Sequence, residues 1–266
     1  MTPAVFRRLV WAHYKKLGRH ELPWRKTRDP YKILVSEVML QQTQVERVAP
    51  YYREFVKKFP TARRLAEAPL SEVLKMWQGL GYNRRAKMLH EAAKGIAESG
   101  MPRSAAELEK LPGVGPYTAA AVAAFAWDEH GLVLETNIRT AITHHFFPGE
   151  TKVSDKEVGE VLRKTAPKGS AREWYYALMD YGSFLKRSGV RINARSAHYS
   201  KQSKFAGSSR QARGAILKEL AKCAQSERRL LSLLGDDRRD QLAQALRELV
   251  TESLVQKTQR GYALAR

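Results

Sequence analysis

Apolar residues recur at helical spacing along the first two thirds of the chain. Between residues 32 and 48 they stand at Ile33, Val35, Val38, Met39 and Val45, closer to the period of a helix than to the alternation of a strand. The same spacing, interrupted by Pro and Gly, predicts further helices over residues 50–60, 70–78, 84–98, 104–110, 116–127, 137–147, 154–165 and 171–186. We therefore predict a mostly α-helical domain over residues 1–185.

The pattern changes twice in the remaining third. Residues 186–213 contain few apolar side chains and carry eight Lys or Arg but no Asp or Glu, which predicts a basic linker or arm. A solvated, disordered connector fits this composition equally well. Residues 214–266 return to helical spacing, and LVQKTQRGYALA then predicts two short strands that turn near Gln259–Gly261. We predict a small winged-helix-like unit; the alternative is a helical cap that packs on the first domain.

Charge and cysteine usage narrow the class of protein. The 266 residues include 47 Lys and Arg against 27 Asp and Glu, a formal net charge of +20, which favours a nucleic-acid partner. The single cysteine, Cys223, excludes an internal disulfide, a cysteine-based zinc site and a four-cysteine iron–sulfur cluster. The charged start lacks the apolar core of a signal peptide, and no apolar run has membrane-spanning length. We expect a cytoplasmic protein, associated with the nucleoid if prokaryotic, and no membrane partner.

A tight turn between two predicted helices carries the first chemical signal. LPGVG at residues 111–115 is followed by the helix PYTAAAVAAFA. Glycine permits a positive φ and close approach of the backbone, and the unpaired N–H groups that begin the second helix can face a phosphate. We predict that a DNA-binding hairpin is formed by Gly113, Val114 and Gly115.

A carboxyl group in an apolar setting carries the second signal. Glu37 lies in SEVMLQQTQV at residues 36–45, downstream of LPWRKTRDPYKI at residues 22–33. A carboxylic acid in an apolar pocket has a raised pKa and can donate a proton near neutral pH. Taken alone, Glu37 would fit an ordinary exposed position on a helix, and the sequence context decides between the two readings.

Several segments together resemble the helix-hairpin-helix superfamily of DNA glycosylases. LPWR, DPY and SEVMLQQTQV, then GLGYNRRAKMLH at residues 79–90 and LPGVGPYTAAAV at residues 111–122, are similar in content and order to the MutY-like adenine glycosylases. The resemblance covers about residues 6–185. It implies a two-lobed, all-helical fold and a hairpin that often holds a monovalent cation through backbone carbonyl oxygens.

The resemblance also implies catalytic roles. Glu37 would protonate the leaving base and help to activate water, and Glu135, in ETNIRT, stands where the family has its catalytic Asp. Breaking an N-glycosidic bond builds positive charge on the sugar and negative charge on the base, which a facing carboxylate and an acid stabilise. Tyr117 stands where glycosylases that also nick DNA carry a Schiff-base lysine, which implies a monofunctional enzyme. The alternative for Glu135 is that it only caps the following helix.

Other positions are implied to contact the DNA bases. The residues that match the pocket for the extruded base are Trp24, Arg25, Tyr176 and Asn137. The residues that match those entering or lining the duplex around the opposite base are Gln42, Thr43, Leu80 and Tyr82. An amide offers both donors and an acceptor, and a tyrosine ring can wedge or stack.

The chain departs from the family in three places. The four cysteines that follow the segment matching residues 174–186 in the family are absent, so no iron–sulfur cluster is expected. Tyr176 replaces the Gln or Glu that reads adenine, which weakens the case for adenine. Residues 214–266 are too short and too helical for the family's hydrolase-like domain that senses 8-oxoguanine. Recognition of 8-oxoguanine would therefore rest on the four residues predicted to contact the duplex.

These features predict a monofunctional base-excision DNA glycosylase. We expect it to act as a monomer, without a cofactor, on double-stranded DNA that holds a mismatched or damaged base. Adenine opposite 8-oxoguanine or guanine is the first expected substrate. Thymine or uracil opposite guanine, and hypoxanthine, remain open. A lesion-binding protein that does not cut the glycosidic bond is the alternative from a different class.

Overall fold

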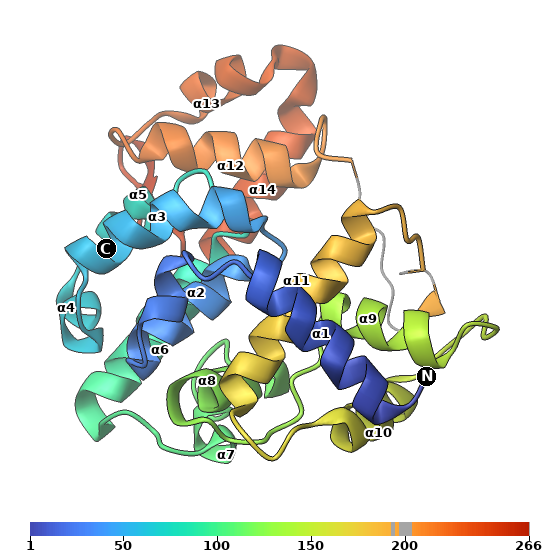
Figure 1. The fold of residues 1–266 in the computed structure, drawn as a ribbon. Helices are drawn as coiled ribbons and strands as arrows, with labels where there is room; N and C mark the ends of the chain where they lie inside the picture. Colours follow the sequence, from blue (N-terminus) through green and yellow to red (C-terminus); the bar gives the residue numbers. More distant parts are fainter. Residues whose placement is uncertain (193–194, 197–203, 266) are drawn as a thin grey trace. The chain divides into compact units, whose positions relative to one another are not determined.

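The computed structural model describes residues 1–192, 195–196 and 204–265 (Figure 1). Helices dominate, which confirms the prediction of a mostly helical chain. The elements up to residue 187 are α1 (Pro3–Leu17), η1 (Pro23–Lys26), α2 (Pro30–Leu40), α3 (Val45–Lys58), α4 (Ala62–Glu67), α5 (Leu70–Met76), α6 (Arg84–Ser99), α7 (Ala105–Leu108), α8 (Pro116–Trp127), α9 (Thr136–Phe146), α10 (Asp155–Thr165) and α11 (Ala171–Arg187). Those that follow are α12 (Ser209–Leu220), α13 (Glu227–Leu234), η3 (Asp236–Arg238), α14 (Arg239–Thr251), β1 (Val255–Thr258) and β2 (Gly261–Leu264).

Contacts between residues divide the chain into two compact units, which we call unit 1 and unit 2. Unit 1 comprises Met1–Leu34, Arg103–Lys110 and Val114–Lys201; unit 2 comprises Val35–Pro102, Leu111–Gly113 and Gln202–Arg266. Each unit therefore combines segments that are far apart in sequence. The basic arm predicted at residues 186–213 lies partly outside the described residues, at 193–194 and 197–203, while its first residues end α11 and its last residues begin α12.

The core of unit 1 contains α8, an alanine-rich helix whose consecutive residues Thr118–Ala126 are all buried. Pro116 stands at its first helical position, where a missing N–H leaves no hydrogen bond unmade. α11 lies against α9 and α1 (Figure 1). Phe6 of α1 meets Trp174 of α11 edge to face, with 6.2 Å between the ring centroids. This packing fixes α11, the helix that carries much of the candidate site.

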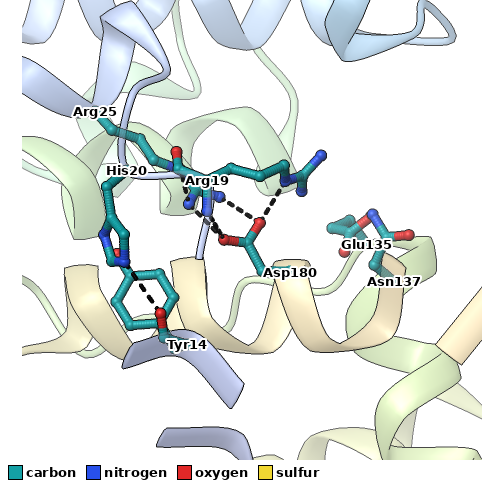
Figure 2. A network of polar contacts seen from close by, with 7 residues as sticks. All are labelled: Tyr14, Arg19, His20, Arg25, Glu135, Asn137 and Asp180. Carbon is teal, nitrogen blue, oxygen red and sulfur yellow. Dashed lines mark hydrogen bonds and ion pairs between the residues drawn. The ribbon is translucent and has the colours of Figure 1, made fainter. Parts of the chain in front are cut away.

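The close approach of α9 and α11 depends on a glycine. A Cβ atom at Gly182 of α11 would overlap the carbonyl oxygen of Asn137, in the first turn of α9. Because glycine has no side chain, the start of α9 lies directly on the middle of α11. Glu135 and Asn137 thereby lie beside the helix that presents Asp180 (Figure 2).

The helices α2 and α3 correct one prediction. The apolar spacing predicts a single helix over residues 32–48, but α2 ends at Leu40 and α3 begins at Val45. Between them Gln42 has a φ of 56°, a left-handed conformation that an α-helix does not contain. The spacing hides the break because buried apolar residues stand on both sides of it. A second expected boundary, at Pro50, is also wrong: α3 runs through Pro50, near its start, where the proline removes only one backbone hydrogen bond.

The helical core of unit 2 is formed by α3 to α6. α4 and α5 lie against α6, and its fully buried large side chains include Phe55, Leu65, Leu74, Trp77 and Leu89. Within the described residues, no helix combines the length and the apolarity needed to cross a bilayer.

The C-terminal residues of unit 2 follow the element order of a winged helix. Three helices, α12 to α14, precede an antiparallel hairpin in which β1 pairs with β2 from Val255 and Leu264 to Thr258 and Gly261. Between α12 and α13, Gln225 exchanges two backbone hydrogen bonds with Tyr262, at 2.9 and 2.8 Å, which adds a short third strand segment. The predicted hairpin and its turn are confirmed. Of the three helices, α13 is the shortest, and Leu230 is its one buried residue.

Candidate functional site

A buried ion-pair cluster in unit 1 centres on Asp180 of α11 (Figure 2). Its carboxylate accepts hydrogen bonds from Arg25 Nη1 and Nη2 at 2.7 and 2.9 Å, and from Arg19 Nε and the Arg19 backbone N at 2.6 and 2.8 Å. The Asp180 side chain is 2% exposed and that of Arg25 5%. Burial by itself raises the pKa of the Asp180 carboxyl, but the bonds and charges of the two arginines outweigh burial and hold the pKa below its ordinary value. Asp180 is therefore ionised at neutral pH.

Further contacts fix the position of Arg25. It lies in the short turn η1 after the buried Trp24, and its carbonyl oxygen accepts a hydrogen bond from Arg172 Nη2 at 2.7 Å. Its guanidinium carbon lies 4.3 Å from the centroid of the Tyr176 ring, and Phe125 stacks on the same ring, also at 4.3 Å. The structure thus brings together Arg25 and Tyr176, two residues that the sequence assigns to one base pocket.

Glu135 forms the N-cap of α9. One carboxylate oxygen accepts a hydrogen bond from the Ile138 backbone N at 2.9 Å, and the other accepts one from Asn137 Nδ2 at 3.0 Å. Burial raises the pKa of the Glu135 carboxyl, although these hydrogen bonds oppose the change. The capping alternative for Glu135 is therefore correct as geometry. Capping does not rule out a catalytic role, because the carboxyl group of Glu135 is partly desolvated and lies beside the side-chain amide of Asn137.

Two cations, Lys186 and Arg139, interact electrostatically with this carboxyl group. Lys186, one turn beyond Gly182 on α11, has a pKa that burial lowers while the charge of Glu135 opposes that lowering. Arg139, one turn into α9, donates to Asp155 at 2.7 and 2.8 Å and lies close enough to Tyr117 for the two to interact electrostatically. Glu135, Asn137 and Tyr117, three residues singled out in the sequence, are therefore linked through α9 within unit 1.

Glu37 belongs to unit 2 and to the last turns of α2. Its side chain is 4% exposed, and its neighbours Val35, Val38 and Met39 are buried as well. Glu37 is therefore buried, as expected for a proton donor, within a stretch of α2 whose neighbouring residues are buried as well.

Arg85 of α6 holds two loops of unit 2 in place. Its Nη1 donates at 2.8, 2.9 and 2.5 Å to the carbonyl oxygens of Val38, Met39 and Gln41. Its Nη2 donates at 3.1 Å to Thr43 Oγ1, and at 3.2 and 3.0 Å to the carbonyl oxygens of Leu80 and Gly81. Burial lowers the pKa of Arg85 to about 10, which leaves it cationic at neutral pH. One guanidinium thus joins the two segments that carry the predicted duplex-contacting residues.

The four residues predicted to contact the duplex differ in accessibility. Gln42 is exposed, and Thr43 and Tyr82 are half-buried. Leu80 is 5% exposed and packs in the core of unit 2. Gln42 and Tyr82 both adopt left-handed backbone conformations, with φ of 56° and 48°. Such conformations are costly for side chains of this size and cluster at functional sites.

The predicted hairpin residues lie in the turn that joins α7 to α8. Gly113 has a φ of 74°, and a Cβ atom there would stand 2.5 Å from Met88 Cβ. Val114 is buried, whereas Gly115, the N-cap of α8, is exposed.

Sequence reasoning missed Arg19, Asp180 and Arg85. The signal for Asp180 is a lone carboxylate in the apolar helix WYYALMDYG, because an unpaired buried charge is costly and implies a partner. For Arg85 the signal is its place shortly after the glycine-containing turn GLGYN, in the pair Arg84–Arg85. Neither signal identifies the residues with which Asp180 and Arg85 interact.

An iron–sulfur cluster does not fit this chain. Its one cysteine, Cys223, is exposed, and the described residues contain no group of three His, Cys, Asp or Glu side chains that could hold a metal ion.

Comparison with known proteins identifies relatives that are DNA repair proteins. Residues 35–168 match the family described as HhH-GPD superfamily base excision DNA repair protein. An adenine DNA glycosylase of Mycolicibacterium smegmatis is 35% identical over 273 residues, covering 93% of this chain and 92% of that protein. One from Buchnera aphidicola of Baizongia pistaciae is 36% identical over 192 residues, 70% of this chain, and there the match spans only about half of the relative, 54%.

Solved structures share the fold. A thermostable thymine-DNA glycosylase superposes with a TM-score of 0.60 at 28% identity, over 68% of this chain and 86% of that one. A non-covalent endonuclease III–DNA complex superposes with a TM-score of 0.57 at 22% identity, over 77% and 91%. The second likeness concerns the fold alone.

Proposed function

Because the chain belongs to the HhH-GPD superfamily of base excision DNA repair proteins, we propose that it hydrolyses the N-glycosidic bond of a mispaired base in double-stranded DNA. The observation that carries the proposal is a pair of protected carboxyl groups at the two positions that resemble the family's catalytic residues. Glu37 is 4% exposed, and the carboxylate oxygens of Glu135 accept hydrogen bonds from the Ile138 backbone N and from Asn137 Nδ2. A glycosidic bond requires both an acid and a carboxylate for its cleavage.

The two carboxyl groups would divide the work. Glu37 would donate its proton to a nitrogen of the base while the bond from that base to the sugar C1′ breaks. The ionised Glu135 would stabilise the positive charge that develops on the sugar. Water then adds to C1′ and returns its proton to Glu37. The products are the free base and an abasic site, so that atoms and protons balance.

Asn137 is suited to hold the attacking water. Its Nδ2 donates to Glu135, while its Oδ1 is buried and makes no hydrogen bond to the described residues. An amide oxygen accepts hydrogen bonds from water. We therefore assign Asn137 a water-positioning role beside the carboxylate.

The reaction would stop at the abasic site. Tyr117 occupies the position at which a lysine would form a Schiff base with the sugar, and a phenol cannot form an imine. The phosphodiester backbone would stay intact until another enzyme or alkali cleaves it.

Adenine is the base that the relatives favour. The curated relatives cited above carry the name adenine DNA glycosylase, and one of them matches nearly the whole chain. Tyr176 packs against Phe125 and the Arg25 guanidinium, so its ring is held in place beside Arg25.

Thymine or uracil opposite guanine is the second candidate. The solved structure that superposes at 28% identity is a thymine-DNA glycosylase. In addition, Tyr176 offers one hydroxyl where the adenine-reading residue of the family has an amide or a carboxyl group, so it presents fewer hydrogen-bonding groups to adenine.

Positive charge and the hairpin would supply the affinity for DNA. The formal net charge of +20 favours phosphate contacts that do not depend on sequence. The turn at residues 111–115 would present backbone N–H groups to a phosphate, and its carbonyl oxygens would hold the monovalent cation that the resemblance implies. The basic residues of the arm at 186–213 would add to the phosphate contacts.

A single-turnover assay on labelled duplexes tests the proposal. The duplexes carry A opposite 8-oxoguanine, A opposite G, T or U opposite G, and hypoxanthine opposite T, and alkali converts abasic sites to strand breaks. We expect breaks at A opposite 8-oxoguanine or G, and only after alkali treatment. Release of a pyrimidine instead would select the second candidate. Tight binding without release from any duplex would replace the proposal with the lesion-binding alternative.

A further inference from the structure

The last part of unit 2, from α12 to β2, is here called the C-terminal unit, and its first helix, α12, contacts Tyr82 directly. Arg210, in the first turn of α12, donates a hydrogen bond from Nη1 to Tyr82 Oη at 3.0 Å. Its guanidinium carbon lies 5.6 Å from the centroid of the Tyr82 ring, and that of Arg85 lies 5.5 Å from the same ring. The two arginines come from α12 and α6, and all three residues belong to unit 2. Tyr82 therefore lies in a clamp of two guanidinium groups.

The clamp acts on a strained residue. Tyr82 has a φ of 48°, and a bulky side chain keeps such a conformation only where its surroundings fix it. The backbone N of Arg85 donates to the Tyr82 carbonyl oxygen at 2.9 Å, which closes the turn on one side. The hydroxyl and ring contacts of Arg210 restrain the side chain itself.

Arg210 stands on a helix that is fixed to its surroundings. Three residues further along α12, Arg213 donates to Glu248 and Glu252 at 2.9 and 2.5 Å, which ties α12 to the end of α14. Lys87 of α6 donates to the Glu252 carbonyl oxygen at 2.8 Å. Through Glu252, these contacts connect α12 and α14 to α6, the helix that begins two residues after Tyr82.

We propose that Arg210 is a positioning residue through which the C-terminal unit holds Tyr82 ready to enter the duplex at the mismatch. The inference rests on the proposed function, because that function gives Tyr82 its contact with DNA. It assigns the C-terminal unit a part in discriminating the opposite base. That part goes beyond general attraction of phosphates, because it acts through the orientation of one aromatic ring.

A binding experiment that needs no base release tests this role. The full-length protein is titrated against duplexes that hold a tetrahydrofuran abasic analogue opposite 8-oxoguanine, G or C, with 2-aminopurine next to the opposite base. The 2-aminopurine fluorescence rises when an inserted side chain unstacks it, and anisotropy gives the affinity. The variants are Arg210→Gln, Arg210→Lys, Tyr82→Ala, and Tyr82→Ala combined with Arg210→Gln. Lys218→Gln, on an exposed position of the same helix, is the charge-matched control.

The expected result is a loss of wedge insertion that Lys218→Gln does not share. Arg210→Gln should reduce the fluorescence rise, and the affinity ratio between 8-oxoguanine and C, by roughly tenfold, since a cation–π contact and a charge-assisted hydrogen bond are lost together. Arg210→Lys should recover part of the signal, and Arg210→Gln should add nothing once Tyr82 is Ala. Unchanged urea midpoints would show that folding is intact.

Two results would overturn the inference. In the first, Arg210→Gln and Lys218→Gln weaken binding equally on all duplexes, which would reduce Arg210 to a general phosphate contact. In the second, the effect of Arg210→Gln persists in the Tyr82→Ala background. A wild-type protein that inserts its wedge but releases no base would contradict the proposed hydrolysis and leave the role of Arg210 supported.

Discussion

Asp180 accepts hydrogen bonds from both terminal nitrogens of Arg25, at 2.7 and 2.9 Å, across 155 residues of sequence. This paired geometry is the strong, directional form of a carboxylate–guanidinium contact. Because both side chains are almost fully buried, the arrangement fixes Arg25, and with it the cationic face against Tyr176, before any base arrives. The base pocket proposed for unit 1 is thus preorganised.

Removing the charge of Asp180 should destabilise the fold strongly. Asp180→Asn leaves Arg25 and Arg19 without their carboxylate, and breaking a buried ion pair costs about 3–5 kcal/mol. Urea denaturation of wild type and variant measures the change in the free energy of unfolding. Glu160→Gln, at an exposed position of α10, is the matched control and should shift that free energy by less than about 0.5 kcal/mol. Equal stability of Asp180→Asn and wild type would mean that the cluster contributes nothing to the fold.

The same contact predicts how stability depends on pH. Hydrogen bonds and charges of the arginines outweigh burial and lower the pKa of Asp180 in the folded state. A carboxyl group with a lowered folded pKa stabilises the fold fully above its unfolded pKa, about 3.9, and loses this contribution as pH falls through the folded value. The stability difference between wild type and Asp180→Asn should be constant from pH 8 to about 5 and shrink below about pH 4. A difference that already shrinks near pH 6 would point to another titrating group.

Glu135 should show the opposite relation between charge and stability. Burial raises its pKa, so the ionised carboxylate costs the folded state free energy at neutral pH, and this cost disappears below the unfolded pKa. In Glu135→Gln the amide oxygen can still accept the hydrogen bond from Ile138 N, and the charge is gone. We expect unchanged or higher stability at pH 7.5, together with a loss of base release of about a hundredfold or more.

A purely capping Glu135 would give a different pattern. Base release would then be normal in Glu135→Gln, and only Glu135→Ala would lose about 1 kcal/mol of stability through the missing cap. Single-turnover rates and urea midpoints of the two variants, measured together, separate catalysis from capping.

The contact between α9 and α11 predicts opposite effects for two glycine substitutions. Gly182→Ala would force a methyl group into the Asn137 carbonyl oxygen, and such overpacking costs about 1–3 kcal/mol or more. Gly214→Ala lies inside α12 with open space around its Cβ position, where alanine should stabilise the helix by about 0.5–1 kcal/mol. Thermal unfolding of both variants tests the pair. A tolerated Gly182→Ala would mean that α9 can move away from α11.

The sequence predicts helices best where spacing and capping agree. For α8 and α10, Pro116 and the capping box of Ser154 with Glu157 mark the starts, and the predicted bounds agree with those observed. The break after Leu40 escaped prediction because it depends on Gln42, a residue type that rarely adopts a positive φ, and on hydrogen bonds from Arg85, more than forty residues away.

The residues of the candidate site also differ in how far the sequence alone can identify them. Glu37, Glu135 and Asn137 are site predictions that rest on short sequence motifs resembling those of the family, so they need no knowledge of the fold. Asp180 and Arg210 could not be assigned, since their meaning comes from partners 155 and 128 residues away. Local patterns identify side chains, whereas only the fold identifies which of them meet.

The most direct test of the central claim compares wild type with Glu37→Gln in release of free adenine. Both proteins are mixed in excess with a duplex that holds A opposite 8-oxoguanine, and the released base is identified by mass spectrometry over a single turnover. Hydrolysis with Glu37 as the acid predicts free adenine from the wild type and a rate reduced at least about a hundredfold in the variant, with DNA affinity retained. An unchanged rate in Glu37→Gln, or no free base from the folded wild type, would contradict it.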